Sequence, residues 1–315
     1  MNADVKTAPR HRNDPVDVIF RYVAFGAATL LLAALSGIVV SLAIGGWPAL
    51  SKFGLSFFTS TSWNPVTDVY GAAGPIVGTL VSSILALIMA LPIAIGIAVF
   101  LTQFAPRVLS QPISIAVELL AGIPSIVYGM WGLFVFAPFF AEKVQLPIML
   151  ATTAHPNSIW AKIFYGVPNG ANIFTASLIL AIMILPYMSA VFRELFRSVP
   201  PQVREAAFGV GATPYEVVTS VLLPYVQKGM VGVIMLGFGR ALGETMAVTF
   251  IIGNSHNFPK SLFDSGSTLA STIANEFNEA SGMHTSALMA LGLVLFLITF
   301  AVLALARALL SSQRY

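Results

Sequence analysis

Long apolar stretches, separated by short polar ones, dominate this sequence. Several of them reach the roughly 20 residues that a helix needs to cross about 30 Å of hydrocarbon. They are continuous and do not alternate with a period of two, which excludes an outer-membrane β-barrel. The pattern therefore predicts an all-α, polytopic membrane protein with six transmembrane helices. We expect these spans at about residues 23–44, 74–101, 112–140, 171–192, 229–252 and 286–305.

The polar stretches predict how the rest of the chain is organised. Residues 1–20 and 309–315 are expected to be cytosolic tails. Residues 21–72 hold the first span, which is too long for the apolar core of a signal peptide, and then an outer interfacial segment. Residues 73–308 form the predicted transmembrane core, with a long polar loop at 193–228.

Two connections in the core have different characters. Residues 141–170 are polar and contain prolines, so we expect a loop. The connection at 253–285 carries Leu269, Ile273 and Phe277 at intervals of four, which predicts a short amphipathic helix on the outer surface.

Composition agrees with a membrane location. Of the 315 residues, 57% are hydrophobic and 9% are charged, whereas soluble domains carry roughly 25% charged residues. The mean hydropathy is +0.85. The sequence has no cysteine, which excludes disulfides and thiolate metal sites. The net charge of +3 predicts no affinity for nucleic acid, and its placement along the chain is more informative.

The placement of Lys and Arg predicts the orientation in the membrane, because positive residues concentrate in cytoplasmic loops. The tails, the 103–111 loop and the 193–228 loop hold eleven of them, against four in the opposite loops. We therefore expect both termini in the cytoplasm. The eleven are Lys6, Arg10, Arg12, Arg21, Arg107, Arg193, Arg197, Arg204, Lys228, Arg307 and Arg314, and the four are Lys52, Lys143, Lys162 and Lys260.

The polar loop before the fifth span is predicted to be a rigid helical hairpin. Pro201 is tolerated at a helix start, and Gly209 and Gly211 supply the turn that ends this first helix. Thr213-Pro214-Tyr215-Glu216 is typical of an N-cap with a capping box. We expect the second helix to end at Pro224. On these features alone, an ordinary ordered loop is the favoured interpretation.

A motif in the same loop adds a specific resemblance. The pattern Glu205-Ala206-Ala207-x3-Gly211-x9-Val221-x-Leu223-Pro224 resembles the EAA loop of bacterial ABC importer permeases, with Val221 in place of Ile. In that family the loop is a coupling helix that docks into a cleft of the ATPase subunit. The resemblance implies ATPase-coupling roles for Glu205, Ala206, Ala207 and Gly211.

Nucleotide chemistry is not expected on this chain. A P-loop requires Gly-Lys-Ser/Thr so that backbone amides and a lysine can bind phosphates, and no Gly-Lys pair occurs in the sequence. We therefore expect ATP and Mg²⁺ to be bound, and ATP to be hydrolysed, by a partner chain. We expect no cofactor and no catalytic residue here.

Two charges lie inside the predicted fifth span. Arg240 falls near the bilayer midplane, where an arginine costs about 2.5–3.5 kcal/mol on insertion scales and usually implies a partner or a water-filled path. Glu244 lies one turn later, close enough to pair. We interpret Arg240 as a station on an anion pathway, because a guanidinium can bind a tetrahedral oxyanion with two parallel hydrogen bonds. The alternative is a structural ion pair that joins two spans.

The third span contributes another candidate and a break. Glu118 is a substrate-pathway candidate that could pair with Arg240 across helices or lie at the cytoplasmic interface. Pro124, within residues 121–125, removes a backbone donor, which a membrane helix tolerates only inside protein or beside water. The histidines of the predicted outer loops have no metal-ligand spacing, and we expect no metal site. They are His155, His256 and His284.

Two further segments are similar to phosphate-importer permeases of the ABC type. Residues 118–132 resemble the third span of that family, and residues 239–248 with Gly253-Asn254 resemble its fifth span. Both look more like the PstC type than the PstA type. The resemblance runs from about residue 20 to the end, and implies a type I (MetI-like) ABC importer permease fold in the bacterial inner membrane.

The resemblance also implies partners and a substrate. These are a PstA-type permease, two PstB-type ATPase subunits, a PstS-type external phosphate-binding protein, and phosphate itself. Two other interpretations stay open: an ABC permease for another oxyanion, such as molybdate or sulfate, and a scaffold that signals external phosphate. A self-sufficient secondary transporter is disfavoured, because the EAA loop would then have no role.

Overall fold

The computed structural model describes residues 15–154 and 157–312. Within them, six helices are long and apolar enough to cross a membrane, which agrees with the hydropathy pattern. The α-helices are α1 (Pro15–Phe53), α2 (Ser56–Thr59), α3 (Ala73–Val99), α4 (Arg107–Ala121), α5 (Ser125–Trp131), α6 (Ala137–Phe140), α7 (Leu146–Thr153), α8 (Ile159–Ile163), α9 (Ile173–Arg197), α10 (Pro201–Gly209), α11 (Pro214–Glu216), α12 (Leu223–Leu242), α13 (Met246–Ile251), α14 (Leu269–Glu276) and α15 (Met283–Ser312). The π-helical segments are Phe100–Phe104, Gly132–Phe136, Ala141–Gln145 and Val217–Leu222, and a short antiparallel hairpin is formed by β1 (Trp63–Asn64) and β2 (Val69–Tyr70).

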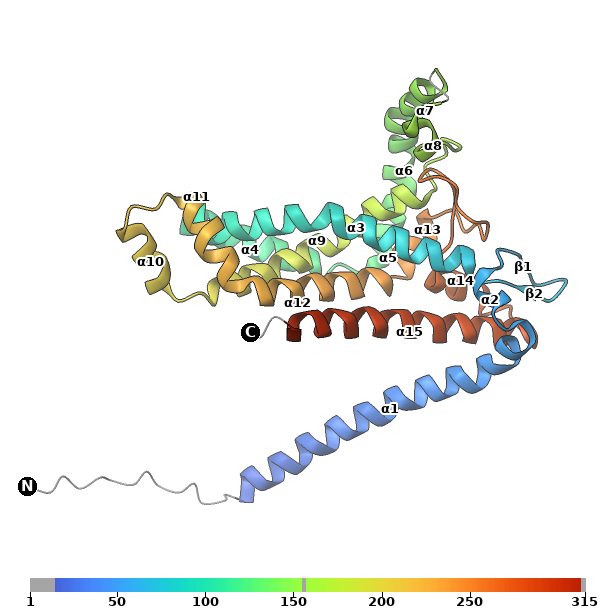
Figure 1. The fold of residues 1–315 in the computed structure, drawn as a ribbon, viewed down its shortest axis with the longest axis horizontal. Helices are drawn as coiled ribbons and strands as arrows, with labels where there is room; N and C mark the ends of the chain where they lie inside the picture. The colour runs from blue at the N-terminus through green and yellow to red at the C-terminus, as the bar shows by residue number, and fades with distance from the viewer. Residues whose placement is uncertain (1–14, 155–156, 313–315) are drawn as a thin grey trace, which may run out of the picture.

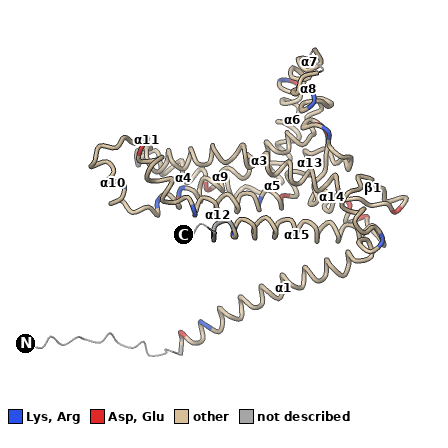
Figure 2. The backbone as a smooth tube through the Cα atoms, viewed as in Figure 1, with Lys and Arg blue, Asp and Glu red and all other residues tan. Residues whose placement is uncertain are grey.

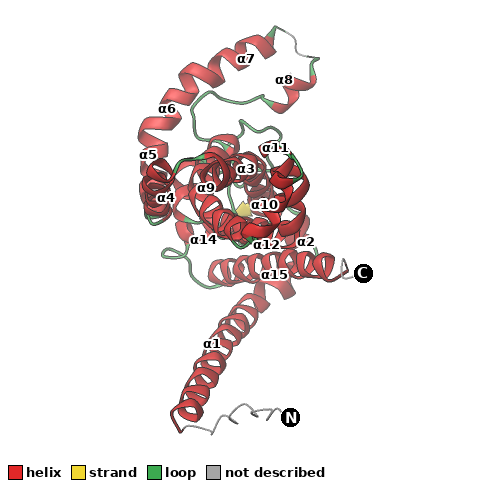
Figure 3. Ribbon diagram, turned by 90° about the vertical axis from the view of Figure 1, so that its left-hand side faces the viewer, coloured by secondary structure: helices red, strands yellow, loops and turns green. Residues whose placement is uncertain are grey.

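The long helices form a bundle. Helices α3, α9, α12 and α15 run side by side along the long axis of the molecule, and α4 and α5 follow one another beside them (Figure 1, Figure 3). Helices α10 and α11 protrude at one end, which we call the coupling end, where α1 begins and α15 ends (Figure 1). The β1–β2 hairpin lies at the other end, which we call the hairpin end. Charged residues lie mainly toward these two ends and around α7 and α8, and few lie along the middle of the bundle (Figure 2), as expected for helices that cross a membrane.

A row of alanines allows the centre of the bundle to pack closely. Helix α3 carries alanines at positions 86, 90, 94 and 98, and each is 0% exposed. They share one core with larger side chains of α9, including Leu180, Ile184 and Met188. Small residues at this spacing let the backbones of two membrane helices approach closely. The pair α3–α9 therefore forms the rigid centre around which the other helices lie.

Helix α1 diverges from its own bundle (Figure 1). It contacts α15 near the hairpin end, where a Cβ on Gly46 would lie 2.9 Å from the backbone of Ala290. The backbone N–H of Ala49 also donates to Ser286 Oγ at 3.0 Å. In contrast, the most apolar stretch of α1 is 0% buried within this chain. The helix thus presents a long apolar surface to its surroundings.

The predicted loop at 141–170 is wrong over its first part, because one helix continues from Ser125 to Thr153. Pro138 and Pro147 each lie at the start of an α-helical segment that follows a π-helical one. The wider π-helical turn before each proline accommodates its missing N–H, so neither residue ends the helix. Helices α6, α7 and α8 form an arm that stands away from the bundle (Figure 1, Figure 3).

The loop at 193–228 forms the predicted helical hairpin at the coupling end. Gly211 has a φ of +89° in the turn, and Thr213 and Glu216 form the predicted capping box. The predicted end of the second helix at Pro224 is wrong, because a continuous helix runs from Pro214 to Leu242. The wider π-helical turns just before Pro224 accommodate its missing N–H. The hairpin is therefore directly continuous with the fifth span.

The remaining predicted connections are partly confirmed. Helix α14 begins at Leu269, which is buried as expected, whereas Phe277 lies just beyond it and is 50% exposed. Helix α1 begins at Pro15 and α15 continues to Ser312, so both extend into segments that were predicted as tails. Other predicted positions lie outside the described residues: Lys6, Arg10, Arg12, His155 and Arg314.

Candidate transport site

Two of the helical segments that cross the bundle are interrupted by short non-helical stretches. Helices α4 and α5 are separated by Gly122-Ile123-Pro124, and helices α12 and α13 by Gly243-Glu244-Thr245. A break leaves backbone N–H and C=O groups without intrahelical partners, which a membrane tolerates only where protein or water satisfies them. Discontinuous membrane helices are also where many transporters bind ions. The two breaks are therefore the candidate site.

The first break is closed by its own backbone and by a tyrosine. The N–H groups of Gly122 and Ile123 donate to the carbonyls of Leu119 and Leu120 at 3.1 and 3.3 Å. The Tyr128 hydroxyl, from the first turn of α5, donates to the Leu120 carbonyl at 2.9 Å. The predicted interruption of the third span is thus confirmed as a break between two helices.

The second break separates the two intramembrane charges. Helix α12 ends at Leu242, and Gly243 follows with φ −90° and ψ 0°. Glu244 Oε1 instead accepts from the backbone N–H of Ala247 at 3.2 Å, which satisfies a first-turn donor of α13. The predicted pair of Arg240 with Glu244 is wrong in this conformation: among the described residues, neither forms an ion pair. The chain turns at Gly243, so the one-turn spacing no longer applies.

Arg240 lies in the last turn of α12. The partial negative charge of a helix C-terminus favours a cation there. Its guanidinium carbon is 5.6 Å from the centroid of the Tyr187 ring on α9, a cation–π contact. The Arg240 side chain is exposed in this single chain. Its hydrogen-bond donors are consequently available to an anion.

The two breaks lie next to each other. Helices α5 and α13 pack closely through Gly129, where a Cβ would lie 2.9 Å from the Cα of Ala247. Arg240 is also close enough to Tyr128 for its charge to act on the phenol. Residues from α5, α9, α12 and α13 therefore meet around one region, which contains Arg240 and two tyrosine rings.

Glu118 lies apart from this region and does not pair with Arg240. Its Oε1 accepts from a guanidinium nitrogen of Arg193 on α9 at 2.5 Å. The Arg193 side chain is only 7% exposed, and it also contacts Glu194 at 3.0 Å. Of the two predicted locations of Glu118, the pairing with Arg240 is thus wrong in this structure. Glu118 joins α4 to the C-terminal part of α9, toward the coupling end.

The predicted coupling residues form an exposed surface. Helix α10 has no buried residue. Glu205 and Ala206 are exposed and Ala207 is half-buried, while Phe208 and Val210 are 48% and 87% exposed. Exposed apolar side chains beside a carboxylate are typical of a surface that binds another protein.

The sequence did not reveal three residues that close a break or contact a predicted site residue. Tyr128 closes the first break, Tyr187 contacts Arg240, and Arg193 is the buried partner of Glu118. No local pattern marks the tyrosines. Arg193 did carry a signal, because an arginine adjoining an apolar span usually needs a partner. Within the described residues, no group of three His, Asp or Glu side chains is arranged to hold a metal ion.

Known proteins resemble this chain over most of its length. The sequence model described as "Binding-protein-dependent transport system inner membrane component" matches residues 90–315. Phosphate transport system permease protein PstC of Haemophilus influenzae is 50% identical over 95% of this chain and 94% of the relative. The PstC protein of Mesorhizobium japonicum is 51% identical over 93% of this chain and 90% of the relative.

The fold also has solved counterparts. A chain in the crystal structure of a bacterial alginate ABC transporter, in complex with an alginate pentasaccharide-bound periplasmic protein, superposes with a TM-score of 0.60. It is 14% identical and the match covers 92% of this chain and 94% of that chain. At this identity the likeness concerns the fold alone, and it confirms the predicted ABC importer permease fold. The chain belongs to the PstC family of binding-protein-dependent inner-membrane permeases, and it is a multi-pass permease subunit.

Proposed function

We propose that this chain forms half of the translocation pathway of an ATP-driven phosphate importer. Its relatives at 50% and 51% identity are named as phosphate permeases, which supports phosphate as the substrate. The observation that carries the anion assignment is Arg240, an exposed guanidinium without a carboxylate partner among the described residues, beside two helix breaks. Two parallel N–H donors of such a group match two oxygens of a tetrahedral anion.

Glu244 and Glu118 have different roles in this proposal. Glu244 lies in the break that follows Arg240, and it caps α13 in the present conformation. If α12 extended past Gly243, Glu244 would move toward Arg240 and compete with the anion for its donors. We assign Glu118 to the coupling side of the pathway, where it holds α4 against α9 through Arg193.

Replacing Arg240 tests the anion assignment. Arg240→Gln is expected to abolish uptake of radiolabelled phosphate while the complex still assembles, because a neutral amide cannot replace the paired cationic donors. Lys143→Gln is the matched control, since Lys143 is exposed and its one ion pair among the described residues is with its exposed neighbour Glu142. Normal uptake by Arg240→Gln overturns the assignment. Inhibition of wild-type uptake by excess molybdate or sulfate would indicate another oxyanion instead.

The proposed partners follow from the exposed surfaces and the family. We assign α10 and the turn at Gly211 to docking on one subunit of a PstB-type ATPase dimer, which would bind ATP and Mg²⁺. A PstA-type permease would supply the other half of the pathway, and a PstS-type protein would deliver phosphate. The distribution of Lys and Arg supports a cytoplasmic coupling end with both termini, and an external hairpin end.

Two glycines of the helical hairpin at the coupling end provide a matched test of coupling. Gly211 has φ +89°, a conformation that costs an L-residue roughly 1–2 kcal/mol, whereas Gly209 lies in α10 with nothing near its absent Cβ. Gly211→Ala is expected to reduce co-purification of the ATPase, and Gly209→Ala to preserve it. Glu205→Lys, which reverses an exposed charge, is expected to act like Gly211→Ala. Full ATPase recovery with both Gly211→Ala and Glu205→Lys contradicts the docking role.

A further inference from the structure

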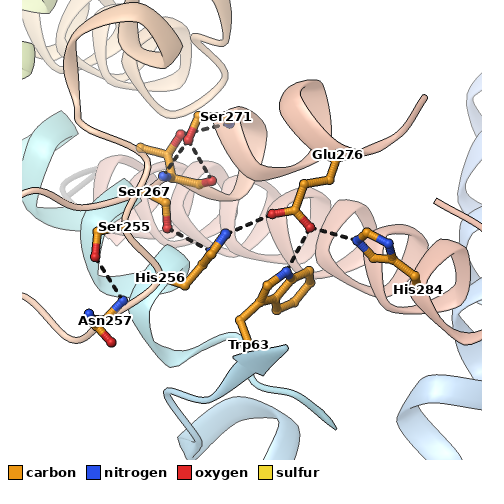
Figure 4. Close-up of polar contacts among 9 residues, drawn as sticks. Trp63, Ser255, His256, Asn257, Ser267, Ser271, Glu276 and His284 are labelled. Carbon is orange, nitrogen blue, oxygen red and sulfur yellow. Dashed lines mark hydrogen bonds and ion pairs between the residues drawn. The ribbon is translucent and has the colours of Figure 1, made fainter. Parts of the chain in front are cut away.

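A carboxylate at the hairpin end is held by three donors. Glu276 Oε1 accepts from His256 Nε2 at 2.8 Å, and Oε2 accepts from His284 Nε2 at 2.7 Å and from Trp63 Nε1 at 2.8 Å (Figure 4). An ionised carboxylate can only accept, so each imidazole carries a proton on Nε2. The second nitrogen of His256 lies 3.5 Å from Ser267 Oγ. The cluster of Trp63, His256, Glu276 and His284 is called the clamp below.

The clamp is enclosed by aromatic rings. Side-chain exposure is 21% for Glu276, 23% for His256 and 12% for His284. Trp63 stacks on the His256 ring at 5.3 Å, and Tyr70 stacks on the His284 ring at 5.5 Å. An aromatic ring thus covers one face of each imidazole, while the Glu276 carboxylate accepts from its edge.

The clamp joins four separate parts of the chain. Trp63 belongs to β1, His256 to the loop at 252–268 after α13, Glu276 to α14, and His284 to the first turn of α15. That loop is also pressed onto α3, because a Cβ on Gly78 would lie 2.0 Å from the Ser267 carbonyl oxygen. Since the loop follows α13 directly, the clamp fixes the external end of the broken fifth span.

The surroundings of the clamp are acidic. Tyr70 donates to Asp68 at 3.3 Å, and burial, together with Asp68 and Glu276, raises the pKa of Tyr70 to about 12. Lys52 donates to the backbone carbonyl of Asp68 at 3.4 Å and lies over the Phe53 ring. Glu279, which follows α14, is exposed, and the loop at 252–268 also carries Lys260 and Asp264. With neutral imidazoles, the clamp therefore carries the charge of Glu276 without a cation inside it.

Glu276 remains ionised over the range in which imidazoles change charge. Burial raises the pKa of Glu276, but hydrogen bonds from His256, Trp63 and His284 outweigh this effect, so its pKa lies below the ordinary value of 4.5. A lowered carboxyl pKa contributes stability above the ordinary pKa and loses it only in stronger acid. Between about pH 5.5 and 8, histidine is the side chain that titrates without a special environment.

We propose that Glu276 is a positioning residue of transport, and that protonation of His256 or His284 turns its neutral hydrogen bonds into ion pairs that tighten the clamp on the external end of the fifth span. External acidity would thus restrain the loop at 252–268 and the movement of α13. The assignment of the hairpin end as the external side that receives phosphate rests on the proposed function. The pH-dependent tightening of the clamp does not depend on that assignment. The three donors are all satisfied by the Glu276 carboxylate, and within the described residues the cluster forms no metal site.

Hydrogen exchange tests the clamp without any transport. Peptides covering 252–268 would be followed in the purified complex at pH 6 and pH 8, for wild type and for Glu276→Gln at the same pH. The wild type is expected to be protected relative to Glu276→Gln at both values, and about fivefold more strongly at pH 6, because charge-assisted hydrogen bonds are roughly twice as strong as neutral ones. Equal protection ratios at the two pH values overturn the proposal.

Trp63→Phe is the matched control, because it removes one hydrogen bond to Glu276 and keeps both imidazoles. It is expected to loosen the loop by the same factor at pH 6 and pH 8, and a strong pH dependence of this loss contradicts the proposal. If Glu276→Gln does not assemble, His284→Gln replaces it with the same expectation. Phosphate uptake is measured separately, as the ratio of variant to wild type at each pH. If the wild type transports no phosphate, the proposed function is contradicted. The hydrogen-exchange result remains a valid test of the clamp in that case.

Discussion

The guanidinium of Arg193 is buried where α9 meets α4, and its position decides what Glu118 does. A buried charge is strongly unfavourable unless it is paired and hydrogen-bonded. Glu118 and Glu194 both accept from Arg193, at 2.5 and 3.0 Å. These two residues lie on different helices, so only Glu118 connects α9 to another element. The pair therefore acts as a tie between α4 and α9 at the coupling side of the first break.

Glu118→Gln is expected to destabilise the chain by about 1–3 kcal/mol, because it leaves a buried cation with a weaker acceptor. The loss is smaller than for a fully buried pair, since the Glu118 side chain is 54% exposed. Glu142→Gln, in the exposed pair with Lys143, is the control and is expected to change stability by less than about 0.5 kcal/mol. Thermal unfolding of the two purified variants checks this. Equal unfolding midpoints would show that the pair with Arg193 contributes nothing.

At the residue scale, the sequence marks charges in apolar spans as candidates, but it does not predict which side chains they contact. Arg240 was recognisable because a charge within an apolar span is unfavourable. Its pairing with Glu244 was inferred from helical spacing, which fails because the helix ends before Gly243. The clamp has no local signature either, since Glu276 lies 20 residues after His256 and 8 before His284. Such contacts depend on how distant segments fold together.

At the scale of elements, the break between α12 and α13 is the feature that distinguishes the fifth span. Gly243 occupies φ −90° and ψ 0°, which other residues can also adopt. A Cβ there would meet the nearest atom at 3.6 Å, an ordinary contact. The break is therefore compatible with alanine on steric grounds, and glycine acts there mainly by disfavouring a continuous helix.

Gly243→Ala is expected to lower phosphate uptake without loss of assembly. Alanine favours helix over glycine by about 0.8–1 kcal/mol, which would extend α12 and bring Glu244 toward Arg240 in competition with the anion. Gly232→Ala, also in α12 and with nothing near its absent Cβ, is the matched control and should leave uptake unchanged. Phosphate uptake by the two variants and by wild type is compared in cells of the same strain. If both variants transport like wild type, the break is not used in transport.

The elements themselves were largely predictable, because hydropathy and capping act locally. The six spans and the capping box of Thr213 and Glu216 follow from such patterns. Prolines misled the prediction twice: Pro224 does not end the hairpin helix, and Pro147 lies in a helix of the arm, within a segment that was expected to be a loop. In both cases a π-helical segment precedes the proline. Sequence patterns do not reveal where such turns form.

At the scale of the whole molecule, the helices of this chain leave large apolar surfaces uncovered. Helix α1 packs on α15 only near the hairpin end, and its most apolar stretch is 0% buried. Large apolar side chains of α4 and α5 beside the breaks, including Leu119 and Val127, are also exposed, at 70% and 50%. Exposed surfaces of this size on a specific fold suit either lipid or a partner subunit. We expect the proposed second permease to cover part of α1.

Substitutions at two glycines of α1 distinguish packing within the chain from packing between subunits. Gly46→Leu is expected to destabilise the purified chain itself, because its side chain would collide with the backbone of Ala290, 2.9 Å from the Cβ position. Gly37→Leu should leave the purified chain unchanged, since nothing lies within 4 Å of that position. In the assembled complex, however, Gly37→Leu should reduce recovery of the tagged second permease if α1 packs closely on it. Thermal unfolding and co-purification give the two readouts. Full recovery of the second permease with Gly37→Leu would mean that this part of α1 faces lipid, because a lipid surface accommodates an added leucine while a close helix–helix contact does not.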